Sequence, residues 1–490
     1  MDTLSKSAIS RSYYWMGISS AFSRVLSFLT TLILAKLLSP DDFGIVSIAV
    51  LVGATLGLVR DLGLNQAIIH SREKSEDILD TALIAGVGIS VLMYGIAFVG
   101  AGEVSRFFRN DDIQYVIRVL PFSLVVTSIS SIYLSHMERE LDFKRRFFPE
   151  LASYAAYTVV SITLAALGFA YWSIIFGQII LELVRLVVVM QVSDFHTKLT
   201  FKMDVFFRLF DIGKFIMTNS VIVFIYRNID DFVIGRLLGT TPLGHYSLAY
   251  RIGNMPATNI THLTGKVTYP ALMKMRGSQD DAVSFYLKVF RYLSIMIIPL
   301  GIGTIALIEP FFHLFFGDKW NAAILPTQLL AVFGMLRGLF SNIGYLFIML
   351  DRVREMTILL SAQLVLLLSF IYPVTVRYDL AGVCLLLLVL NLLMSIAGTL
   401  RLRAFFPGFI GAHARRMLLP LLLSTASFIG TRALFEIFFK EVSFLSFSSL
   451  VAISVVLYCS IMLLTNRKII DEMKSFFTSA ILPDGQKTDA

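Results

Sequence analysis

Charged residues are scarce in this chain: they make up 16% of its 490 residues, whereas hydrophobic residues make up 56%. The mean hydropathy is +0.76. A soluble globular domain has about 25% charged residues, so this composition excludes a soluble protein and predicts an integral membrane protein. Cysteine is nearly absent as well. Cys384 and Cys459 both lie inside apolar runs, where they are expected to be small hydrophobic side chains that indicate no redox compartment.

Motifs for nucleotide, metal and nucleophilic chemistry are also missing. Lys214 and Lys266 each follow a glycine, but neither has the upstream glycine and the following Ser or Thr of a phosphate-binding loop. Residues 301–306 resemble a dinucleotide loop, yet they lie within an apolar run, where close helix packing is the simpler interpretation. No His-Glu-x-x-His zinc motif and no nucleophile elbow occur. We therefore expect no ATP hydrolysis, no metal and no cofactor.

Long apolar runs follow one another almost from end to end. A membrane-spanning helix needs about 20 mostly apolar residues, and this criterion predicts an all-α polytopic membrane protein with about 14 transmembrane helices. The predicted spans are 13–35, 43–62, 81–101, 115–135, 151–169, 172–192, 212–237, 243–269, 292–308, 324–350, 356–376, 380–400, 417–435 and 444–464.

Lys and Arg gather in alternate loops, which predicts the orientation. If the N-terminus is cytoplasmic, the loops on the cytoplasmic side hold most of the basic residues, as the positive-inside rule requires. Both termini are therefore predicted to be cytoplasmic. Basic loops facing an anionic inner leaflet also account for the formal net charge of +8, so no nucleic-acid partner is expected.

The chain contains an internal duplication. Leu-Ala-Lys-Leu-Leu, a glycine and Ser-Ile-Ala within 34–49 recur as Ile-Gly-Arg-Leu-Leu, a glycine and Ser-Leu-Ala within 234–249. About six predicted spans separate the copies, so both point the same way, as in two-lobed secondary transporters that bind substrate between their halves. The predicted divisions are an N-terminal six-helix lobe (1–195), a C-terminal six-helix lobe (196–405), two additional helices (406–466) and a cytoplasmic tail (467–490).

The first predicted span carries a polar face that the duplication repeats. A charged side chain at mid-bilayer costs at least about 2.5–3.5 kcal/mol, so such residues should face a cavity or a partner. Close packing of small residues is the alternative for the serines and threonines, but it fits an arginine poorly. The face consists of Ser20, Arg24, Ser27 and Thr31, and adding 200 gives Ser220, Phe224, Arg227 and Asp231.

A second polar stripe follows the predicted span 243–269. Lining of a cavity is the favoured interpretation of the whole stripe, although His262 alone is better explained as a satisfied interior histidine. Arg337 is a further candidate for an inward-facing cation, whereas Arg118, Arg185 and Arg432 are interpreted as snorkelling toward an interface. The stripe consists of Arg251, Asn254, Thr258, His262, Gly265 and Tyr269, with Lys266 beside it.

Three acids are candidates for ion coupling. Asp230 and Asp231 follow Arg227 at the spacing of an intrahelical ion pair, so local neutralisation explains one of them. The remaining carboxylate, or Asp61 beside Arg60, is a candidate for binding a coupling proton or cation. Both interpretations stay open at this point.

Paired acids in an early loop also raise an enzymatic alternative. Membrane glycosyltransferases that use lipid-linked sugars carry such acids, and Asp41 and Asp42 occupy that place. However, the loop is short and no large outer domain is present. The acids are more simply the first turn of the helix that begins near Pro40. We therefore predict a transporter and no enzymatic activity.

Several motifs resemble a known family. They are Leu-Leu-Ser-Pro-Asp-Asp-Phe-Gly at 37–44, Asp-Leu-Gly-Leu at 61–64, Asn-Ile-Asp-Asp-Phe-Val-Ile-Gly at 228–235 and Leu-Gly-His-Tyr-Ser-Leu-Ala-Tyr-Arg at 243–251. With the overall length, these motifs resemble the bacterial Wzx-like oligosaccharide flippases of the multidrug/oligosaccharidyl-lipid/polysaccharide exporter superfamily.

The resemblance implies transfer of an undecaprenyl-pyrophosphate-linked oligosaccharide from the inner to the outer leaflet of the bacterial cytoplasmic membrane by alternating access. Such a step serves O-antigen, capsule or exopolysaccharide assembly and implies a polysaccharide polymerase and chain-length machinery as partners. For this substrate, the residues predicted to bind phosphate are Arg24, Arg227, Arg251, Lys266 and Arg337. Those predicted to meet sugar hydroxyls are Ser20, Ser27, Asn254, Thr258 and Tyr269.

Two alternatives belong to the same superfamily. A drug or metabolite cation antiporter should have a cavity in which acids outweigh cations, whereas the candidates here are mostly cationic. A peptidoglycan-precursor flippase would show the same cationic lobes, so residue chemistry separates it poorly. The driving force also stays open, because an inside-negative potential favours outward movement of an anion by about 2.3 kcal/mol per charge per 100 mV without any coupling ion.

Overall fold

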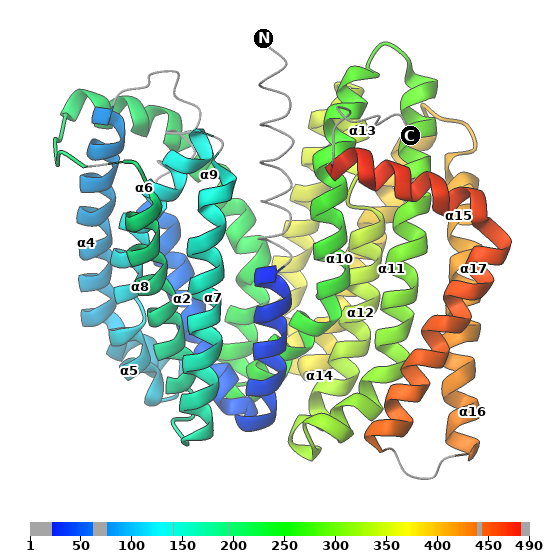
Figure 1. The fold of residues 1–490 in the computed structure, drawn as a ribbon, viewed down its shortest axis with the longest axis horizontal. Helices are drawn as coiled ribbons and strands as arrows, with labels where there is room; N and C mark the ends of the chain where they lie inside the picture. Colours follow the sequence, from blue (N-terminus) through cyan, green and yellow to red (C-terminus); the bar gives the residue numbers. More distant parts are fainter. Residues whose placement is uncertain (1–21, 62–75, 141, 196, 439–442, 482–490) are drawn as a thin grey trace, which may run out of the picture. The chain divides into compact units, whose positions relative to one another are not determined.

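The computed structural model describes residues 22–61, 76–140, 142–195, 197–438 and 443–481. Within these ranges every regular element is a helix (Figure 1), which confirms the predicted all-α class. The helices are residues 22–37, α2 (Pro40–Asp61), α4 (Glu76–Phe108), α5 (Asp112–Val119), α6 (Phe122–Arg139), α7 (Phe143–Ala166), α8 (Trp172–Val192), α9 (Met203–Leu237), α10 (Thr240–Lys274), α11 (Gln279–Phe315), η1 (Asp318–Ala323), α12 (Ile324–Leu339), α13 (Ile343–Met349), α14 (Val353–Arg403), α15 (Phe409–Ser424), η2 (Thr425–Gly430), α16 (Thr431–Phe438) and α17 (Phe444–Ile481).

The start of α2 shows how the local sequence sets a helix boundary. The Ser39 amide and hydroxyl both donate to Asp42 Oδ2, at 2.8 and 2.6 Å, and the Asp42 amide donates back to Ser39 Oγ at 3.2 Å. This reciprocal capping box satisfies amides that the first helical turn leaves without partners. Pro40 occupies the first helical position, where its missing N–H costs nothing. The interpretation of this segment as a helix start is thus confirmed.

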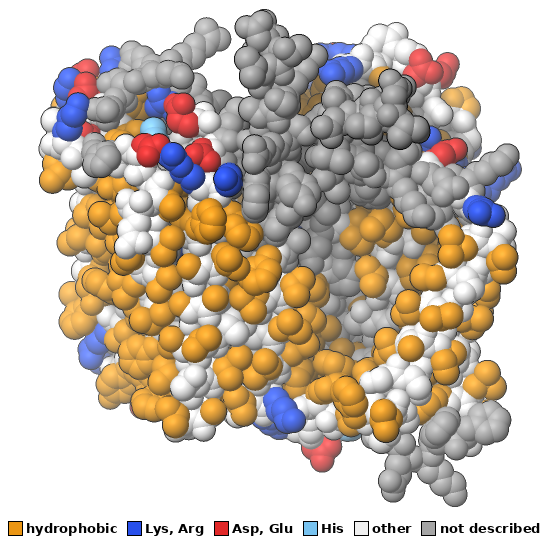
Figure 2. Space-filling model, in the orientation of Figure 1, with side chains coloured by type: hydrophobic (Ala, Val, Ile, Leu, Met, Phe, Trp, Pro, Cys, Tyr) orange, Lys and Arg blue, Asp and Glu red, His pale blue; other side chains and the backbone are white. Residues whose placement is uncertain are grey.

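Nine ranges of the described residues are long and apolar enough to cross a membrane. One of them, α14, contains two helices, because the backbone leaves helical geometry at Asp379 (φ 52°, ψ −150°). Helices α7, α9 and α10 are not among these ranges. The protein is a multi-pass membrane protein, and the count of fourteen spans stays a prediction. On the face drawn in Figure 2, hydrophobic side chains cover the middle of the helices and most charged side chains gather at helix ends.

The described residues form two compact units, one up to Gly244 and one from His245 to Phe477. In the first unit, α7 packs along α8, α8 along α6, and α6 and α5 along α4 (Figure 1). A hydrophobic cluster joins the ends of α4, α6, α8 and α9. In it, Phe195 is 5% exposed and its ring lies edge-on to Tyr133 at 5.3 Å. The predicted boundaries at residues 195, 405 and 466 stay predictions.

The second unit is built around α11, which packs against α12, α15 and η2. Its core includes a buried histidine, His413, held by two hydrogen bonds. The Phe409 carbonyl can only accept, so the 2.8 Å contact places the proton on His413 Nδ1. The other ring nitrogen then accepts from the Tyr286 hydroxyl at 3.1 Å. A neutral histidine therefore satisfies its polar atoms inside an aromatic cluster.

The connection between α8 and α9 is tied to the start of α4 by a buried carboxylate. Asp80 is 0% exposed. Its Oδ1 accepts from the Thr197 hydroxyl at 2.7 Å, and its Oδ2 accepts from the Lys198 amide at 3.1 Å and from the Thr200 hydroxyl at 3.2 Å. Hydrogen bonds to a charged group are stronger than neutral ones, so this carboxylate fixes the path of a segment that has no regular structure.

Replacing Asp80 with asparagine is expected to destabilise this connection by about 1.5–3 kcal/mol, the range for hydrogen bonds to a charged group. The amide nitrogen of asparagine would face donors where an oxygen now accepts. Hydrogen exchange of residues 197–202 should report the loss as faster exchange. Asp77→Asn is the matched control, because Asp77 is 37% exposed and its contacts with Lys202 at 2.6 Å and with the Thr200 hydroxyl at 3.4 Å lie at the surface, so the change should cost at most about 1 kcal/mol. Equal exchange in both variants would contradict the assignment.

Candidate functional site

A cavity of about 260 Å³ lies between α2 and α9 in the first unit. Its polar lining comes from Arg60 and Asp61, at the end of α2, and from Ser220 on α9. Phe224 lies one helical turn after Ser220 and adds an aromatic side chain. The remaining lining is Ala54, Gly57, Leu58 and Met217.

The cavity contains two positions of the face that the duplication predicted. Ser220 and Phe224 are the counterparts of Ser20 and Arg24, and they lie on one side of α9 because four residues make about one turn. Asp61, a predicted coupling candidate, lines the same cavity. Ser20 lies outside the described residues, and Arg24 and Ser27 are half-buried on the helix 22–37. Their predicted roles stay predictions.

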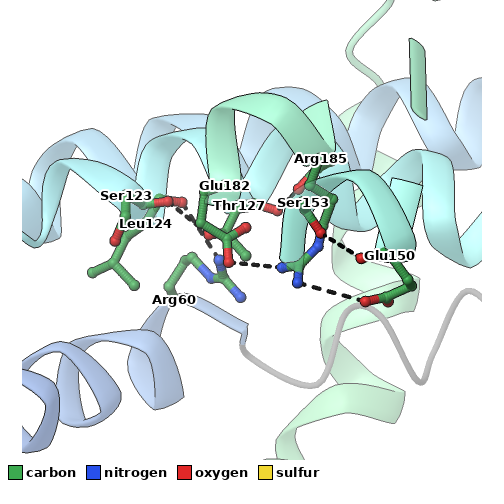
Figure 3. A network of polar contacts seen from close by, with 9 residues as sticks. Arg60, Ser123, Leu124, Thr127, Glu150, Ser153, Glu182 and Arg185 are labelled. Carbon is green, nitrogen blue, oxygen red and sulfur yellow. Dashed lines mark hydrogen bonds and ion pairs between the residues drawn. The ribbon is translucent and has the colours of Figure 1, made fainter. Parts of the chain in front are cut away.

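Arg60 contacts a polar network on α6 and α8 (Figure 3). Its Nη1 donates to the Leu124 carbonyl of α6 at 3.4 Å. On α8, Glu182 lies beside Arg60 and interacts with it electrostatically. Glu182 also accepts from Arg185 Nη1 at 2.7 Å, and Arg185 Nη2 lies 3.6 Å from Glu150 Oε2 of α7. Charged side chains of α2, α8 and α7 therefore alternate in sign here, and α6 contributes a backbone carbonyl.

The sequence did not lead us to predict this network. Arg185 was expected to snorkel, but its side chain is only 13% exposed and lies between two carboxylates, Glu150 and Glu182. Likewise, Arg432 of α16 does not simply reach for an interface, because it donates to Glu309 Oε2 at 2.7 Å and to the Ala306 carbonyl at 2.7 Å on α11. The three-residue spacing of Glu182 and Arg185 was the available signal.

The two copies of the duplicated motif touch each other in the first unit. A Cβ atom at Gly44 would lie 1.8 Å from the Thr240 carbonyl oxygen, and one at Gly244 would lie 1.7 Å from the Pro40 carbonyl oxygen. The contact is reciprocal, because position 44 of each copy meets position 40 of the other. Only glycine allows such an approach of two backbones. The start of α2 thus lies against the start of α10.

Hydrogen bonds surround this helix crossing. Asp41 Oδ1 accepts from the Thr240 and Thr241 hydroxyls, the second at 3.0 Å. Asp42 Oδ1 accepts from the Tyr171 amide at 3.0 Å. Burial and the nearby charge of Asp112 raise the pKa of Tyr171 to about 12, so its hydroxyl stays protonated and donates to Asp112 Oδ1 at 3.1 Å. The two acids of this segment therefore serve helix contacts.

The predicted stripe of α10 is divided between surface and helix interface in the second unit. Arg251 and Thr258 are exposed, whereas Asn254 is 3% exposed and lies against Gly334 of α12. The Asn254 amide atoms have no hydrogen-bond partner in the described residues. The side chains of Lys266 and His262 lie outside those that the structure describes. Tyr269, 42% exposed, contacts the ring of Tyr345 at 5.4 Å.

The remaining candidates lie on α9 and α12. Arg337 of α12 is half-buried, and its Nη1 donates to the Tyr250 hydroxyl of α10 at 3.1 Å. This contact places the Arg337 side chain against α10 at Tyr250, the residue that precedes Arg251. On α9, Arg227 is exposed, Asp231 is half-buried and Asp230 is 5% exposed. Phosphate binding and ion coupling at these residues stay predictions.

Comparison with known proteins identifies the family. Residues 33–325, more than half of the chain, match the family described as polysaccharide biosynthesis protein. The lipopolysaccharide biosynthesis protein WzxC of Escherichia coli is 25% identical over 69% of this chain and 69% of its own length. The succinoglycan biosynthesis transport protein ExoT of Rhizobium meliloti is 24% identical over 67% of each chain.

A solved structure shares the fold. The lipid II flippase MurJ in an inward closed conformation superposes with a TM-score of 0.69 at 15% identity, covering 92% of this chain and 99% of that one. The resemblance to Wzx-like flippases inferred from the motifs is confirmed at the level of the family. Since the family match spans most of the first lobe, both copies of the duplication and the helices that line the cavity, this chain belongs to the polysaccharide biosynthesis protein family.

Proposed function

We propose that this protein transfers an undecaprenyl-pyrophosphate-linked oligosaccharide from the inner to the outer leaflet of the bacterial cytoplasmic membrane by alternating access. The observation that carries the proposal is a chain of the polysaccharide biosynthesis family with the fold of a lipid II flippase over 92% of its length. The name of ExoT, which is a biosynthesis transport protein, supports transport over catalysis. In this proposal the protein has no enzymatic activity.

The physics of the substrate explains why such a protein is needed. An unpaired polar group in hydrocarbon costs a few kcal/mol and a bare ion far more, so the sugars and the pyrophosphate need a polar path. The lipid tail stays in the bilayer. The pyrophosphate is bound in this proposal by four arginines, whose guanidinium groups can each form two hydrogen bonds to phosphate, and by one lysine, whose ammonium group adds a positive charge. These residues are Arg24, Arg227, Arg251, Arg337 and Lys266.

The proposed setting follows from the same substrate. Both termini are cytoplasmic, since the basic loops should stay on that side, and the polymerase and chain-length machinery act on the product. Energy comes from the inside-negative potential acting on the anionic substrate. Coupling to a proton or cation at Asp61, Asp230 or Asp231 is the second candidate mechanism, and it is favoured only by the place of Asp61 in the cavity.

Arg24→Ala and Arg251→Ala are expected to lower transfer roughly tenfold to a hundredfold, because each removes a charged hydrogen bond of about 1.5–3 kcal/mol. Transfer of a fluorescent undecaprenyl-pyrophosphate oligosaccharide across liposomes measures this. Arg106→Ala is the control, because Arg106 forms an exposed pair with Glu103 and should transfer like wild type.

A different result would favour a drug or metabolite antiporter. That result is no protein-dependent transfer of the oligosaccharide lipid, with or without a proton, sodium or voltage gradient, combined with extrusion of a cationic dye. Transfer of lipid II in place of the oligosaccharide lipid would favour the peptidoglycan-precursor flippase.

A further inference from the structure

The cavity between α2 and α9 has the size of a small polar ligand. Its volume of about 260 Å³ corresponds to the liquid volume of roughly nine water molecules, which is comparable with one sugar ring. It is smaller than the roughly 300–1,000 Å³ of sites for drug-sized molecules. The cavity therefore has room for one sugar residue.

Arg60, the cation in the lining of this cavity, lies beside two carboxylates. Arg60 and Asp61 are adjacent and opposite in sign, and Glu182 interacts with Arg60 from the other side. A site whose cation is already balanced by two carboxylates has little electrostatic preference for a diphosphate. It does offer N–H donors and carboxylate acceptors side by side. Each sugar hydroxyl both donates and accepts, so vicinal hydroxyls match this arrangement.

An aromatic side chain completes the chemistry. Phe224 is half-buried and lines the same cavity as Arg60 and Asp61. The C–H face of a sugar ring carries partial positive charge and packs against the negative face of an aromatic ring. Ser220, one turn before Phe224, adds a hydroxyl on the same side of α9. A cavity lined by both a polar pair and an aromatic ring suits a sugar better than a lipid chain or a phosphate.

The network behind Arg60 fixes its orientation. The Leu124 carbonyl accepts from Arg60 Nη1 at 3.4 Å, and Glu182 is itself anchored by Arg185 at 2.7 Å. Figure 3 shows the Arg60 side chain turned toward these partners on α6 and α8. An arginine has many rotamers, and holding one of them removes most of the entropy cost of forming a hydrogen bond to a ligand. Glu182 is thus a positioning residue for Arg60.

We propose that the α2–α9 cavity is a saccharide subsite, in which Arg60 and Asp61 hold hydroxyls of one sugar residue and Phe224 contacts its ring. The proposal rests on the proposed transport of a lipid-linked oligosaccharide and identifies the part of the protein that binds the sugar. It separates this site from the cationic residues proposed for the pyrophosphate. The cavity is then a place where sequence differences change sugar specificity.

Protection of an introduced thiol tests the subsite directly. Full-length protein with Cys384→Ser and Cys459→Ser receives Ser220→Cys, and the rate of its reaction with N-ethylmaleimide is measured. Two probes are compared: undecaprenyl-pyrophosphate-linked oligosaccharide extracted from the native cells, and bare undecaprenyl pyrophosphate. Ile222→Cys is the control, because Ile222 is 52% exposed on α9 and does not line the cavity.

The oligosaccharide lipid at about ten times its Kd should slow the reaction of the Ser220→Cys protein about tenfold, since only the free site reacts. Bare undecaprenyl pyrophosphate should leave the rate nearly unchanged, and neither probe should affect the Ile222→Cys protein. Equal protection by both probes would overturn the proposal, because the cavity would then bind the diphosphate or the lipid.

Transfer by the protein with both native cysteines replaced separates the two proposals. If it transfers the oligosaccharide lipid but the Ser220→Cys thiol is not protected, the saccharide subsite is wrong and the proposed function stands. If neither transfer nor protection occurs, both are wrong. Phe224→Leu and Phe224→Tyr give a second measure: loss of protection is expected with leucine and retention with tyrosine, and equal protection in both would contradict the role of the ring.

Discussion

Gly44→Ala and Gly244→Ala are each expected to lower transport more than tenfold and to destabilise the protein. An added Cβ would lie 1.8 Å from the Thr240 carbonyl oxygen in the first variant and 1.7 Å from the Pro40 carbonyl oxygen in the second. Backbone atoms cannot turn away as a side chain can, so the usual overpacking cost of about 1–3 kcal/mol is a lower bound. The starts of α2 and α10 must separate. Liposome transfer and thermal unfolding in detergent measure both effects.

Gly53→Ala is the matched control on the same helix, because a Cβ at Gly53 meets no atom within 4 Å. This variant should transport like wild type and should be slightly more stable, since alanine favours a helix over glycine by roughly 1 kcal/mol. The double variant Gly44→Ala/Gly244→Ala should cost less than the sum of the single ones, because both break the same contact. Wild-type transport by either single variant would show that the crossing is not tightly packed during the cycle.

The helices could largely be predicted from the sequence, because apolar runs of spanning length have few alternatives in a membrane. The predicted spans 356–376 and 380–400 lie on either side of the break at Asp379. Helix ends were less predictable: α11 runs from Gln279 to Phe315, beyond the predicted 292–308. Polar residues outside the hydrocarbon carry no apolar signal, so hydropathy could not show these extensions.

Helical periodicity predicted part of the candidate site. The duplication and the four-residue spacing placed Ser220 and Phe224 on one face, and both line the cavity. Contacts between distant segments were not predictable in this way. The repeat showed two equal copies, but nothing in a repeat indicates that Gly44 of one copy touches Thr240 of the other. Long-range pairing depends on which helices become neighbours, and a single sequence does not record that.

The spacing of two charged residues in the sequence does not show whether their ion pair is buried. Two Glu–Arg pairs of the first unit have the same residue types, the same three-residue spacing and the same distance of 2.7 Å: Glu182 with Arg185, and Glu103 with Arg106. Their side chains differ in exposure, at 17% and 13% for the first pair and 76% and 78% for the second. Water screens the attraction within an exposed pair, whereas a buried charge that has lost its partner keeps an uncompensated desolvation free energy.

Glu182→Ala is therefore expected to destabilise the protein by up to about 3–5 kcal/mol, the cost of removing one partner of a buried ion pair, because Arg185 then keeps only Glu150 at 3.6 Å. Glu103→Ala, the matched control, should cost at most about 1 kcal/mol. Unfolding in mixed micelles at increasing SDS content measures both. Because Glu182 also holds Arg60 in place, its loss should weaken binding at the α2–α9 cavity more than Glu103→Ala does. Similar losses of stability in the two variants would mean that water reaches the pair on α8, and the network would then contribute no more than surface ion pairs do.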